Sequence, residues 1–328
     1  MNLRRVCVYG AGAIGGNLAA MIASSGAEVS VVVRGANLAA IRKNGLRVET
    51  AQGTVTAKVA ASDDPAELGV QDLVIVTTKT PALPDVAHGI APLLGPETPV
   101  VFAINGIPWW YGDGLTGPYV GLSLPQLDQG GVLHDRVGTA RTLGGVVYAA
   151  SSVIEPGVVR VSSKHNRLIV GEIDHRVTPR AEAIVALLKA GGVEGVVSAD
   201  IRSDVWTKLI INLGNGPASV LSGSAISLLI AQPAIENSIR AVCAEAMQVA
   251  EKLGHTSSVD VEAYIANSRN LAHKPSILQD LELGRRMEVA TLYEATLTLA
   301  RLAGVETPVL DLLISLVVLR AKSAGLYG

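Results

Sequence analysis

The sequence is poor in aromatic residues and in charge. Aromatic residues make up only 3% of the 328 positions, with a single Phe, and charged residues make up 17%, whereas 49% are hydrophobic. With so few rings, the core must consist mainly of Val, Leu, Ile and Ala, a mixture typical of parallel strands covered by helices. The length is sufficient for two domains.

Basic tracts and cysteine clusters are also missing. The formal net charge is −2 and the sequence has no basic tract, which argues against nucleic acid as a main partner. The two cysteines, Cys7 and Cys243, lie far apart and have no metal-ligand spacing. We expect them to be buried free thiols in a reducing cytoplasm, and we expect no metal site. A strand pattern begins within a few residues of Met1, so no signal peptide is expected.

One window carries no charge at all. It extends from Leu209 to Ile235 and is long enough to span a bilayer. However, it contains two asparagines, two prolines, three glycines and several serines, which a membrane-spanning helix rarely combines. We therefore predict a buried helix followed by a loop in a soluble protein, with no membrane contact.

The first half alternates between apolar strands and helical segments. Continuous apolar strands separated by helices predict a doubly wound α/β sheet of the Rossmann type. A hairpin of alternating pattern is expected at 45–62. The predicted strands are 4–9, 28–33, 72–79 and 99–105, and the predicted helices are the segment that ends near Ser25 and the segment 82–94.

The pattern changes twice further along the chain. Strands with turn signals occupy 140–173, a helix follows at 179–190, and only helical patterns remain after about Arg202. One of these is a single long helix predicted from Ser276 to Gly304. We predict two domains, 1–199 of the Rossmann type and 200–328 all-helical.

The segment "VYGAGAIGG" contains Gly10, Gly12 and Gly15 in a G-x-G-x-x-G spacing. In a dinucleotide site these glycines make the tight turn, leave room for the pyrophosphate and let the helix pack on the strand. The phosphates then lie at a helix N-terminus, where unpaired N–H groups favour anions. A glycine-rich turn without a ligand is the alternative, but the loop stands between a predicted strand and a predicted helix.

The end of the second strand indicates which cofactor is bound. An NAD site places Asp or Glu there for the ribose 2′-hydroxyl, but this sequence has Arg34, with no acid nearby in the sequence. A guanidinium suits a 2′-phosphate and can stack on adenine. The sequence thus favours NADP(H) over NAD(H), with a solvated loop arginine as the alternative.

Two polar residues end the next strands. Lys79 ends "DLVIVTTK" and Asn105 ends "PVVFAIN", and open α/β sheets bind ligands at the carboxyl ends of their strands. Lys79 could equally be a surface lysine, and Asn105–Gly106 could simply form a turn. The segment 108–110, "PWW", is expected to pack a loop rather than to contact substrate.

Lys208 is the last charge before the uncharged window, and Asn212 and Asn215 follow on the same helix face. Asn215, seven residues on, is only about 20° from Lys208 around an ideal helix. An ammonium group in a water-poor site has a lowered pKa and can donate a proton near neutral pH. A lysine that merely extends to water, with asparagines that cap the helix, is the alternative.

The segment 276–288 contains the predicted partner of Lys208. Ser276 and Glu288 fall on the same predicted helix, and Asp280 faces the same side as Glu288 to within about 80°. Glu288 could orient Lys208 and bind a substrate hydroxyl, or it could pair with Arg285. Ser276 with Gln279 also fits a capping box.

Together these segments resemble the ketopantoate reductase (2-dehydropantoate 2-reductase) family. The resemblance rests on "GAGAIGG", "VVVR", "VTTK", "NGI", "GGVVYAASSVIEPGVV", "WTKLIINLGNGP", "HKPSILQDLELGRRMEV" and "GVETP", which cover nearly the whole chain in family order. It implies NADPH-dependent reduction of 2-dehydropantoate to pantoate in pantothenate and coenzyme A biosynthesis, with the active site between a Rossmann domain and a helical domain of the 6-phosphogluconate dehydrogenase type. A homodimer is also implied.

The resemblance implies a role for each candidate residue. Lys208 would be the general acid, with Glu288 as the second catalytic residue. Substrate would be bound by Asn105, Asn212, Asn215 and Ser276, and cofactor by Gly10, Gly12, Ala13, Ile14, Gly15, Arg34, Lys79 and Asn105.

The sequence departs from the family pattern at several positions. The family's second asparagine after the lysine corresponds to Gly216, and Asn215 stands one residue earlier. Ala290 replaces an acid, Glu294 a glycine and Ala82 a glutamine. These changes leave two alternatives open: a reductase of a different small oxo acid, and a non-catalytic NADP(H)-binding sensor.

Overall fold

The computed structural model describes residues 3–328, and the chain separates into two compact units. The first comprises the chain up to Ile104 and Pro108–Ile201, and the second comprises Asn105–Ile107 and Arg202–Gly328. The break between the units after Ile201 falls two residues beyond the domain boundary predicted at 199. The short segment Asn105–Ile107 groups with the helical unit, although the strand Val100–Ala103 of the first unit ends only two residues before it.

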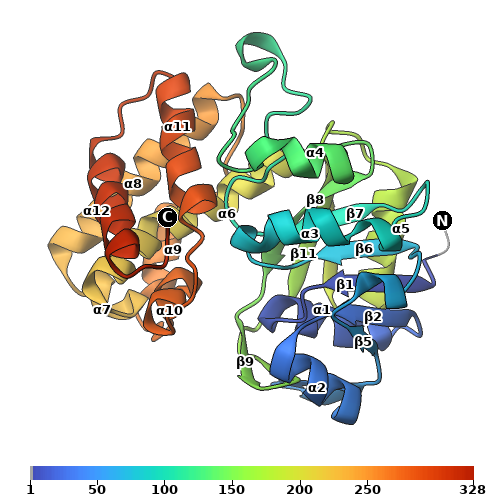
Figure 1. Ribbon diagram of the computed structural model, residues 1–328. Coiled ribbons are helices and arrows are strands. Elements are labelled where there is room, and N and C mark those ends of the chain that lie inside the picture. Colours follow the sequence, from blue (N-terminus) through green and yellow to red (C-terminus); the bar gives the residue numbers. More distant parts are fainter. Residues whose placement is uncertain (1–2) are drawn as a thin grey trace. The chain divides into compact units, whose positions relative to one another are not determined.

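The first unit is built on an eight-stranded sheet in the order β12-β11-β8-β7-β6-β1-β2-β5 (Figure 1). All neighbouring pairs are parallel except β8 and β11. The strand order reverses beside β1, because the chain passes first to β2 on one side and later to β6 on the other. The strands are β1 (Arg5–Tyr9), β2 (Glu28–Val32), β5 (Ala60–Ser62), β6 (Leu73–Val76), β7 (Val100–Ala103), β8 (Thr142–Tyr148), β11 (Arg167–Glu172) and β12 (Glu194–Ser198).

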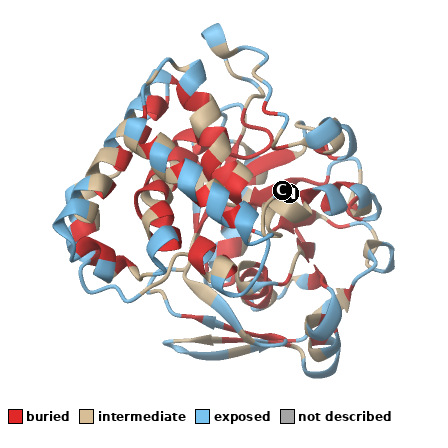
Figure 2. Ribbon diagram, turned by 60° about the vertical axis from the view of Figure 1, so that its left-hand side comes forward, coloured by how far each residue is buried: buried red, intermediate tan, exposed pale blue. Residues whose placement is uncertain are grey.

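Helices cover both faces of this sheet. Helix α1 contacts α5, whereas α3 contacts α4. Apolar runs such as Leu73–Val76 are fully buried, as expected for strands covered on both sides, and Figure 2 shows the buried positions in red. The helices are α1 (Ala13–Ala23), α2 (Gly35–Asn44), α3 (Leu83–Gly89), α4 (Val132–Arg136) and α5 (Pro179–Ala190), with 3₁₀ turns at Pro65–Glu67, Thr80–Ala82, Ala91–Leu93, Gly117–Tyr119 and Gln129–Gly131.

A smaller four-stranded sheet, in the order β4-β3-β10-β9, completes the first unit. The predicted hairpin is present as β3 (Leu46–Thr50) paired antiparallel with β4 (Gly53–Ala57). Strands β9 (Ser151–Glu155) and β10 (Val158–Val161) form a second hairpin, which joins the first through β10 and β3. The doubly wound α/β class predicted from the sequence is therefore confirmed.

The second unit is helical, as the sequence predicts. The uncharged window forms the rest of α6 after Lys208, then α7 and the start of α8, and no helix among residues 3–328 is long and apolar enough to cross a membrane. Cys243, like Cys7, is a buried free thiol. The helices are α6 (Ile201–Ser222), α7 (Ile226–Ile230), α8 (Pro233–Lys252), α9 (Val261–Ser268), α10 (Ser276–Glu282), a π-helical segment (Ala290–Glu294), α11 (Ala295–Leu302) and α12 (Pro308–Ser323).

The single long helix predicted from Ser276 to Gly304 is wrong. Helix α10 ends after Glu282, and Gly284 takes a positive φ of 62°. The N–H of Arg285 then donates to the carbonyl of Asp280, as at a typical left-handed helix end. Glycine adopts this left-handed conformation without strain, so the chain can turn at Gly284 and leave the helix. The helical spacing of apolar residues continues in the sequence beyond this turn. Asp280 and Glu288 therefore do not share a helix.

The predicted capping box at Ser276 is also not formed. Pro275 takes the capping position of α10, so Ser276 is the first helical residue and is exposed. The Gln279 Nε2 donates instead to the carbonyl of Lys274, at 2.8 Å. Ser276 thus has no capping role in this helix.

Candidate active site

The glycine loop between β1 and α1 depends on its missing side chains. Gly10 has a φ of 103°, and a Cβ there would lie 2.7 Å from Thr78 Cγ2. A Cβ on Gly15 would lie 2.0 Å from the carbonyl oxygen of Gly10. Gly12 faces open space, with nothing within 4 Å of a Cβ. The loop is therefore closed against the protein at Gly10 and Gly15, and it is open at Gly12, where a ligand can approach the backbone.

Thr77 and Thr78, at the end of β6, support this loop and were missed by the sequence reasoning. Thr77 Oγ1 donates to the carbonyl of Gly10 at 2.7 Å. Thr78 lines the neighbouring cavity, and its buried Oγ1 has no hydrogen-bond partner within the described chain. A buried hydroxyl without a partner is costly, which favours a ligand there. The signal in the sequence was the pair of threonines before Lys79.

A cavity of about 600 Å³ lies beside the loop, at the point where the strand order reverses. Its size and position, with the N-terminus of α1 at Ala13 and Ile14, fit a dinucleotide whose phosphates meet helix N–H groups. Ala82 lies in its wall. The lining residues are Tyr9, Gly10, Ala11, Gly12, Val32, Val33, Arg34, Asn37, Asp63, Pro65, Thr78, Ala82, Asp85, Val86, His88 and Gly89.

Arg34 lines this cavity, and an acid that is distant in the sequence lies beside it. Asp85, from α3, places a carboxylate oxygen 3.6 Å from its guanidinium. Both side chains are mostly exposed, at 74% and 70%, so the pair contributes little to stability. Arg34 thus remains able to turn toward a phosphate.

Lys79 stands apart from the cavity lining. It is half-buried and precedes the 3₁₀ turn Thr80–Ala82, directly after the two threonines. Trp109 and Trp110 are buried, as expected for packing residues, with Trp109 edge-on to Phe102. The tryptophans thus belong to the core of the first unit.

In the helical unit, α6 places Lys208 and Asn212 one turn apart, both half-buried. Burial lowers the pKa of Lys208 from its usual value to about 8, and the negative charge of Glu288 opposes that shift. At pH 7 such a lysine is roughly nine-tenths protonated. It can therefore donate a proton near neutral pH, more readily than an exposed lysine.

Glu288 is not part of an α-helix. Its side chain is buried, at 5% exposure, in the stretch between α10 and the π-helical segment. The N–H of Met287 donates to the carbonyl of Leu326, and the N–H of Leu292 donates to the carbonyl of Glu288. Glu288 is thus fixed on both sides, and its electrostatic effect on Lys208 shows that the two predicted catalytic residues lie close together.

Asn215 is buried and is engaged with the protein. Its Nδ2 donates to the carbonyl of Ile211 at 2.8 Å and to the hydroxyl of Tyr264, in α9, at 2.7 Å. Both amide hydrogens are thus used, so a contact with substrate would have to use the side-chain oxygen. Asn215 links α6 to α9.

The presence of glycine at the next position, 216, is explained by packing. The hydroxyl of Tyr293 fills the space beside it, and a Cβ on residue 216 would lie 2.5 Å from that oxygen. Tyr293 is fully buried, and its hydroxyl has no hydrogen-bond partner in the described chain. A side chain at 216 and a tyrosine at 293 therefore exclude one another.

This packing predicts a coupled effect on stability. In an ordinary helix, Gly→Ala is favourable by up to about 1 kcal/mol. Here we expect Gly216→Ala to destabilise the protein by roughly 1–3 kcal/mol, because the new methyl group overpacks against Tyr293. Tyr293→Phe should be nearly neutral, since no protein hydrogen bond is lost. In the Tyr293→Phe background, Gly216→Ala should become neutral or stabilising.

The measurement is the urea midpoint of the four proteins in a double-mutant cycle. A Gly216→Ala penalty of the same size in both backgrounds would show that the Tyr293 hydroxyl is not the obstacle.

The remaining candidates, Asn105 and Ser276, lie on different segments of the helical unit. Asn105 is half-buried, and Ile107, two residues on, donates its N–H to the carbonyl of Thr291 at 2.9 Å. Ser276 is exposed at the start of α10. The structure thus ties the Asn105 segment to the chain that follows Glu288.

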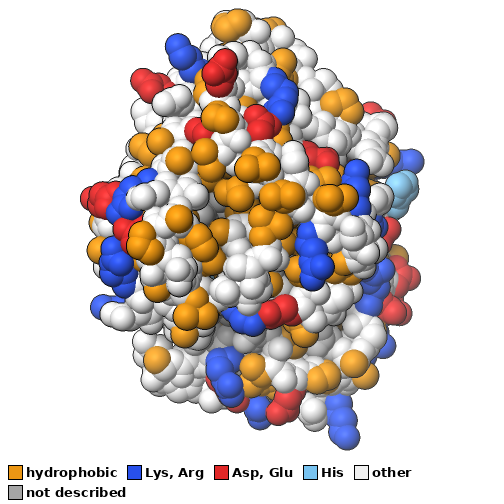
Figure 3. Space-filling view, turned by 90° about the vertical axis from the view of Figure 1, so that its left-hand side faces the viewer, with side chains coloured by type: hydrophobic (Ala, Val, Ile, Leu, Met, Phe, Trp, Pro, Cys, Tyr) orange, Lys and Arg blue, Asp and Glu red, His pale blue; other side chains and the backbone are white. Residues whose placement is uncertain are grey.

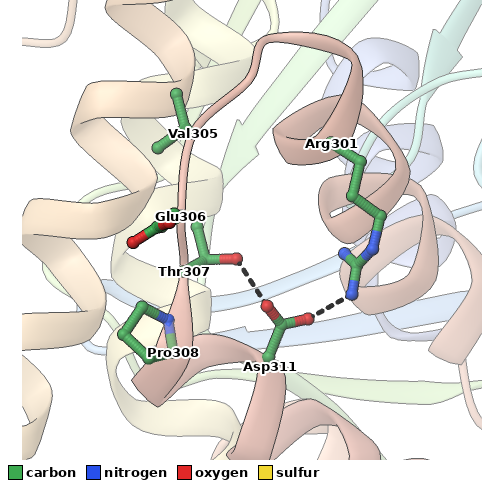
Figure 4. Close-up of a pocket in the computed structure, with 6 residues that line it drawn as sticks. All are labelled: Arg301, Val305, Glu306, Thr307, Pro308 and Asp311. Atoms are coloured by element: carbon green, nitrogen blue, oxygen red, sulfur yellow. Dashed lines mark hydrogen bonds and ion pairs between the residues drawn. The ribbon is translucent and has the colours of Figure 1, made fainter.

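A second hollow, of about 380 Å³, lies at the turn between α11 and α12 and contains none of the predicted residues (Figure 4). Two of its charged side chains are paired with each other, since Asp311 accepts hydrogen bonds from Arg301 and from Thr307. Glu294, one of the departures from the family pattern, is also engaged locally, because it accepts a hydrogen bond from the Tyr327 hydroxyl at 2.6 Å. Neither feature extends the candidate site.

Comparisons with known proteins cover nearly the whole chain. The family model "Ketopantoate reductase PanE/ApbA" matches residues 6–175, and its C-terminal counterpart matches residues 200–321. A 2-dehydropantoate 2-reductase from Mesorhizobium japonicum is 40% identical over 99% of this chain and 100% of its own length.

Solved structures agree with these matches. A crystal structure assigned to the ketopantoate reductases, from Ralstonia solanacearum MolK2, is similar with a TM-score of 0.91 and 39% identity, over 99% of this chain and all of the other. A PanE/ApbA family ketopantoate reductase from Ralstonia eutropha JMP134 has a TM-score of 0.82 and 26% identity, over 98% and 99% of the two chains. From its Rossmann-type loop to its terminal helices, this chain belongs to the ketopantoate reductase family.

Proposed function

We propose that this protein reduces 2-dehydropantoate to pantoate with NADPH, as a step of pantothenate biosynthesis. The observation that carries the proposal is Lys208 on the polar face of α6, whose pKa burial lowers to about 8 while the negative charge of Glu288 opposes that shift. A non-catalytic sensor would need neither residue. The name of the 40% identical relative, a 2-dehydropantoate 2-reductase, supports the substrate.

The chemistry assigned to Lys208 follows from its charge. A bound nicotinamide supplies the hydride for the ketone carbon. As the carbonyl bond is reduced, negative charge grows on its oxygen, and the Lys208 ammonium group stabilises that charge and donates its proton to it. Lys208 is then neutral and regains a proton from water. Glu288 favours the charged form of Lys208 before each turnover.

The other polar groups would hold the substrate. Asn212, one turn after Lys208, offers a donor and an acceptor on the same face of α6. Asn105 and Ser276 offer an amide and a hydroxyl, and Asn215 offers its side-chain oxygen. In this proposal Glu288 also accepts a hydrogen bond from the substrate hydroxyl, which a carboxylate does well.

The cofactor preference rests on Arg34. It lies at the capping position of α2 and lines the 600 Å³ cavity, so its guanidinium can pair with a 2′-phosphate there. The open face at Gly12 and the N-terminus of α1 would hold the pyrophosphate, with Lys79 close in sequence to the supporting threonines. We propose NADPH as the reductant on these grounds.

Steady-state kinetics on a panel of oxo acids tests the proposal. With NADPH, we expect 2-dehydropantoate to have the highest kcat/KM, at least tenfold above 2-oxo acids of similar size that lack its hydroxyl. A hydroxyl-free acid that is turned over as well as 2-dehydropantoate would point to a different oxo-acid reductase. Tight NADPH binding without turnover of any oxo acid would point to a sensor.

The expected homodimer and cytoplasmic location stay predictions. The buried free thiols Cys7 and Cys243 agree with a reducing compartment. Figure 3 shows hydrophobic side chains on the side of the molecule that it presents. On α12, Leu312, Leu316 and Leu319 are exposed, and their spacing of four and three residues places them on one face of that helix. Exposed apolar patches often mark a protein interface, so this face is where we would place a second copy.

A further inference from the structure

A backbone hydrogen bond joins the segment Asn105–Gly106–Ile107 to the rest of the helical unit. The N–H of Ile107 donates to the carbonyl oxygen of Thr291 at 2.9 Å. Thr291 belongs to the π-helical segment Ala290–Glu294. A π-helical turn is wider than an α-helical turn, and such turns are frequent at functional sites. Here the segment supplies a backbone acceptor to a strand-end loop.

Gly106 makes the close approach possible. Its φ is 80°, and a Cβ there would lie 2.5 Å from the carbonyl oxygen of Thr291 and 2.9 Å from the N–H nitrogen of Leu292. Both obstacles are backbone atoms of a buried segment, so they cannot move aside as a flexible side chain would. Glycine is therefore required at 106 for its conformation and for its lack of a side chain.

The π-helical segment is also bonded to Glu288, which lies three residues before Thr291. The N–H of Leu292 donates to the carbonyl of Glu288 at 3.1 Å, and Thr291 Oγ1 approaches that carbonyl at 3.4 Å. Thr291, Leu292 and Glu288 are all buried. The path from Ile107 to Glu288 thus contains two backbone hydrogen bonds, of 2.9 and 3.1 Å, in a buried region with little freedom to vary.

We propose that Gly106 is a positioning residue, which seats its backbone on Thr291 and thereby fixes the Asn105 amide relative to Glu288. The inference rests on the proposed function, in which Asn105 and Glu288 contact the same bound oxo acid. A displacement of about 1 Å in such a group can lower a rate by as much as about 10²-fold. In this proposal Gly106 acts through Asn105 rather than through a contact of its own.

The experiment is a double-mutant cycle on Asn105 and Gly106, with a matched glycine control. We expect Gly106→Ala to lower kcat/KM for 2-dehydropantoate by about 10- to 100-fold, mainly through kcat. Gly254→Ala is the control, because Gly254 has a similar φ of 84° but nothing within 4 Å of a Cβ. It should change kcat/KM by less than about twofold. In the Asn105→Ala background, Gly106→Ala should add less than about twofold, because the residue that it positions is gone.

The outcomes separate this inference from the proposed function. If Asn105→Ala leaves kcat/KM unchanged, the role proposed for Asn105 is wrong and the positioning role is wrong with it. If Asn105→Ala is impaired but Gly106→Ala behaves like Gly254→Ala, or loses as much activity in the Asn105→Ala background as alone, only the positioning role is wrong.

Hydrogen exchange on the unaltered protein gives a second test that does not depend on a variant folding. The Ile107 amide should exchange as slowly as the amides of Ala290–Glu294, because it bonds to that buried segment. Exchange of the Ile107 amide at the rate of an open loop would overturn the inference.

Discussion

Lys208→Ala is expected to lower kcat for 2-dehydropantoate reduction by about 10²- to 10⁴-fold, the range typical of a lost general acid. The ammonium group both stabilises charge on the substrate oxygen and supplies the proton, so its removal affects the transition state more than the bound substrate. NADPH affinity should be unchanged, because the variant leaves intact the groups proposed to bind the phosphates, which are Gly12, the N-terminus of α1 and Arg34.

The matched control is Lys252→Ala, which removes an exposed lysine from α8 in the same unit. It should leave kcat within about twofold of the unaltered protein. A kcat for Lys208→Ala within about threefold of the unaltered enzyme, less than 1 kcal/mol, would show that Lys208 is not the proton donor.

The second large effect is expected at Arg34. Arg34→Ala should lower kcat/KM for NADPH by roughly 10- to 100-fold, the loss of a charge-assisted contact worth about 1.5–3 kcal/mol. The value for NADH should change by less than about twofold, since NADH has no 2′-phosphate. Asp85, 3.6 Å from Arg34, does not prevent this contact, because both groups are largely in water and can separate.

Lys43→Ala is the control for Arg34, because it removes an equal charge from the exposed surface of the same helix, α2, without touching the cavity. We expect it to affect the two cofactors equally. Equal losses with NADPH and NADH in Arg34→Ala would mean that Arg34 does not recognise the 2′-phosphate.

The parts of the fold that were predicted from the sequence depend on short-range patterns. The glycine loop follows β1 and precedes α1 within a dozen residues, and the apolar strands are continuous, so local periodicity was sufficient. The prediction failed between Ser276 and Gly304, where the apolar spacing continues although the chain does not stay helical. The break depends on a left-handed Gly284 and on a buried stretch fixed to the C-terminus by Met287 and Leu326.

In the candidate site, too, short-range patterns were predictable and long-range contacts were not. Lys208, Asn212 and Asn215 share a helix, and helical geometry is enough to place them on one face. The contacts that could not be predicted all join elements distant in sequence: Asp85 with Arg34, Tyr264 with Asn215, and Tyr293 with Gly216. A single sequence contains no signal for such pairs, because each residue type is compatible with many partners.

The central claim is that Lys208 is the proton donor, and the pH dependence of kcat/KM tests it most directly. A general acid works in its protonated form, so activity should be constant below the pKa of Lys208 and should fall above it. With a pKa of about 8, kcat/KM for 2-dehydropantoate should decline about tenfold per pH unit on the alkaline side of pH 8. The residual activity of Lys208→Ala should lack that decline. A flat profile of the unaltered enzyme from pH 7 to about 10, or the same alkaline decline in Lys208→Ala, would contradict the account.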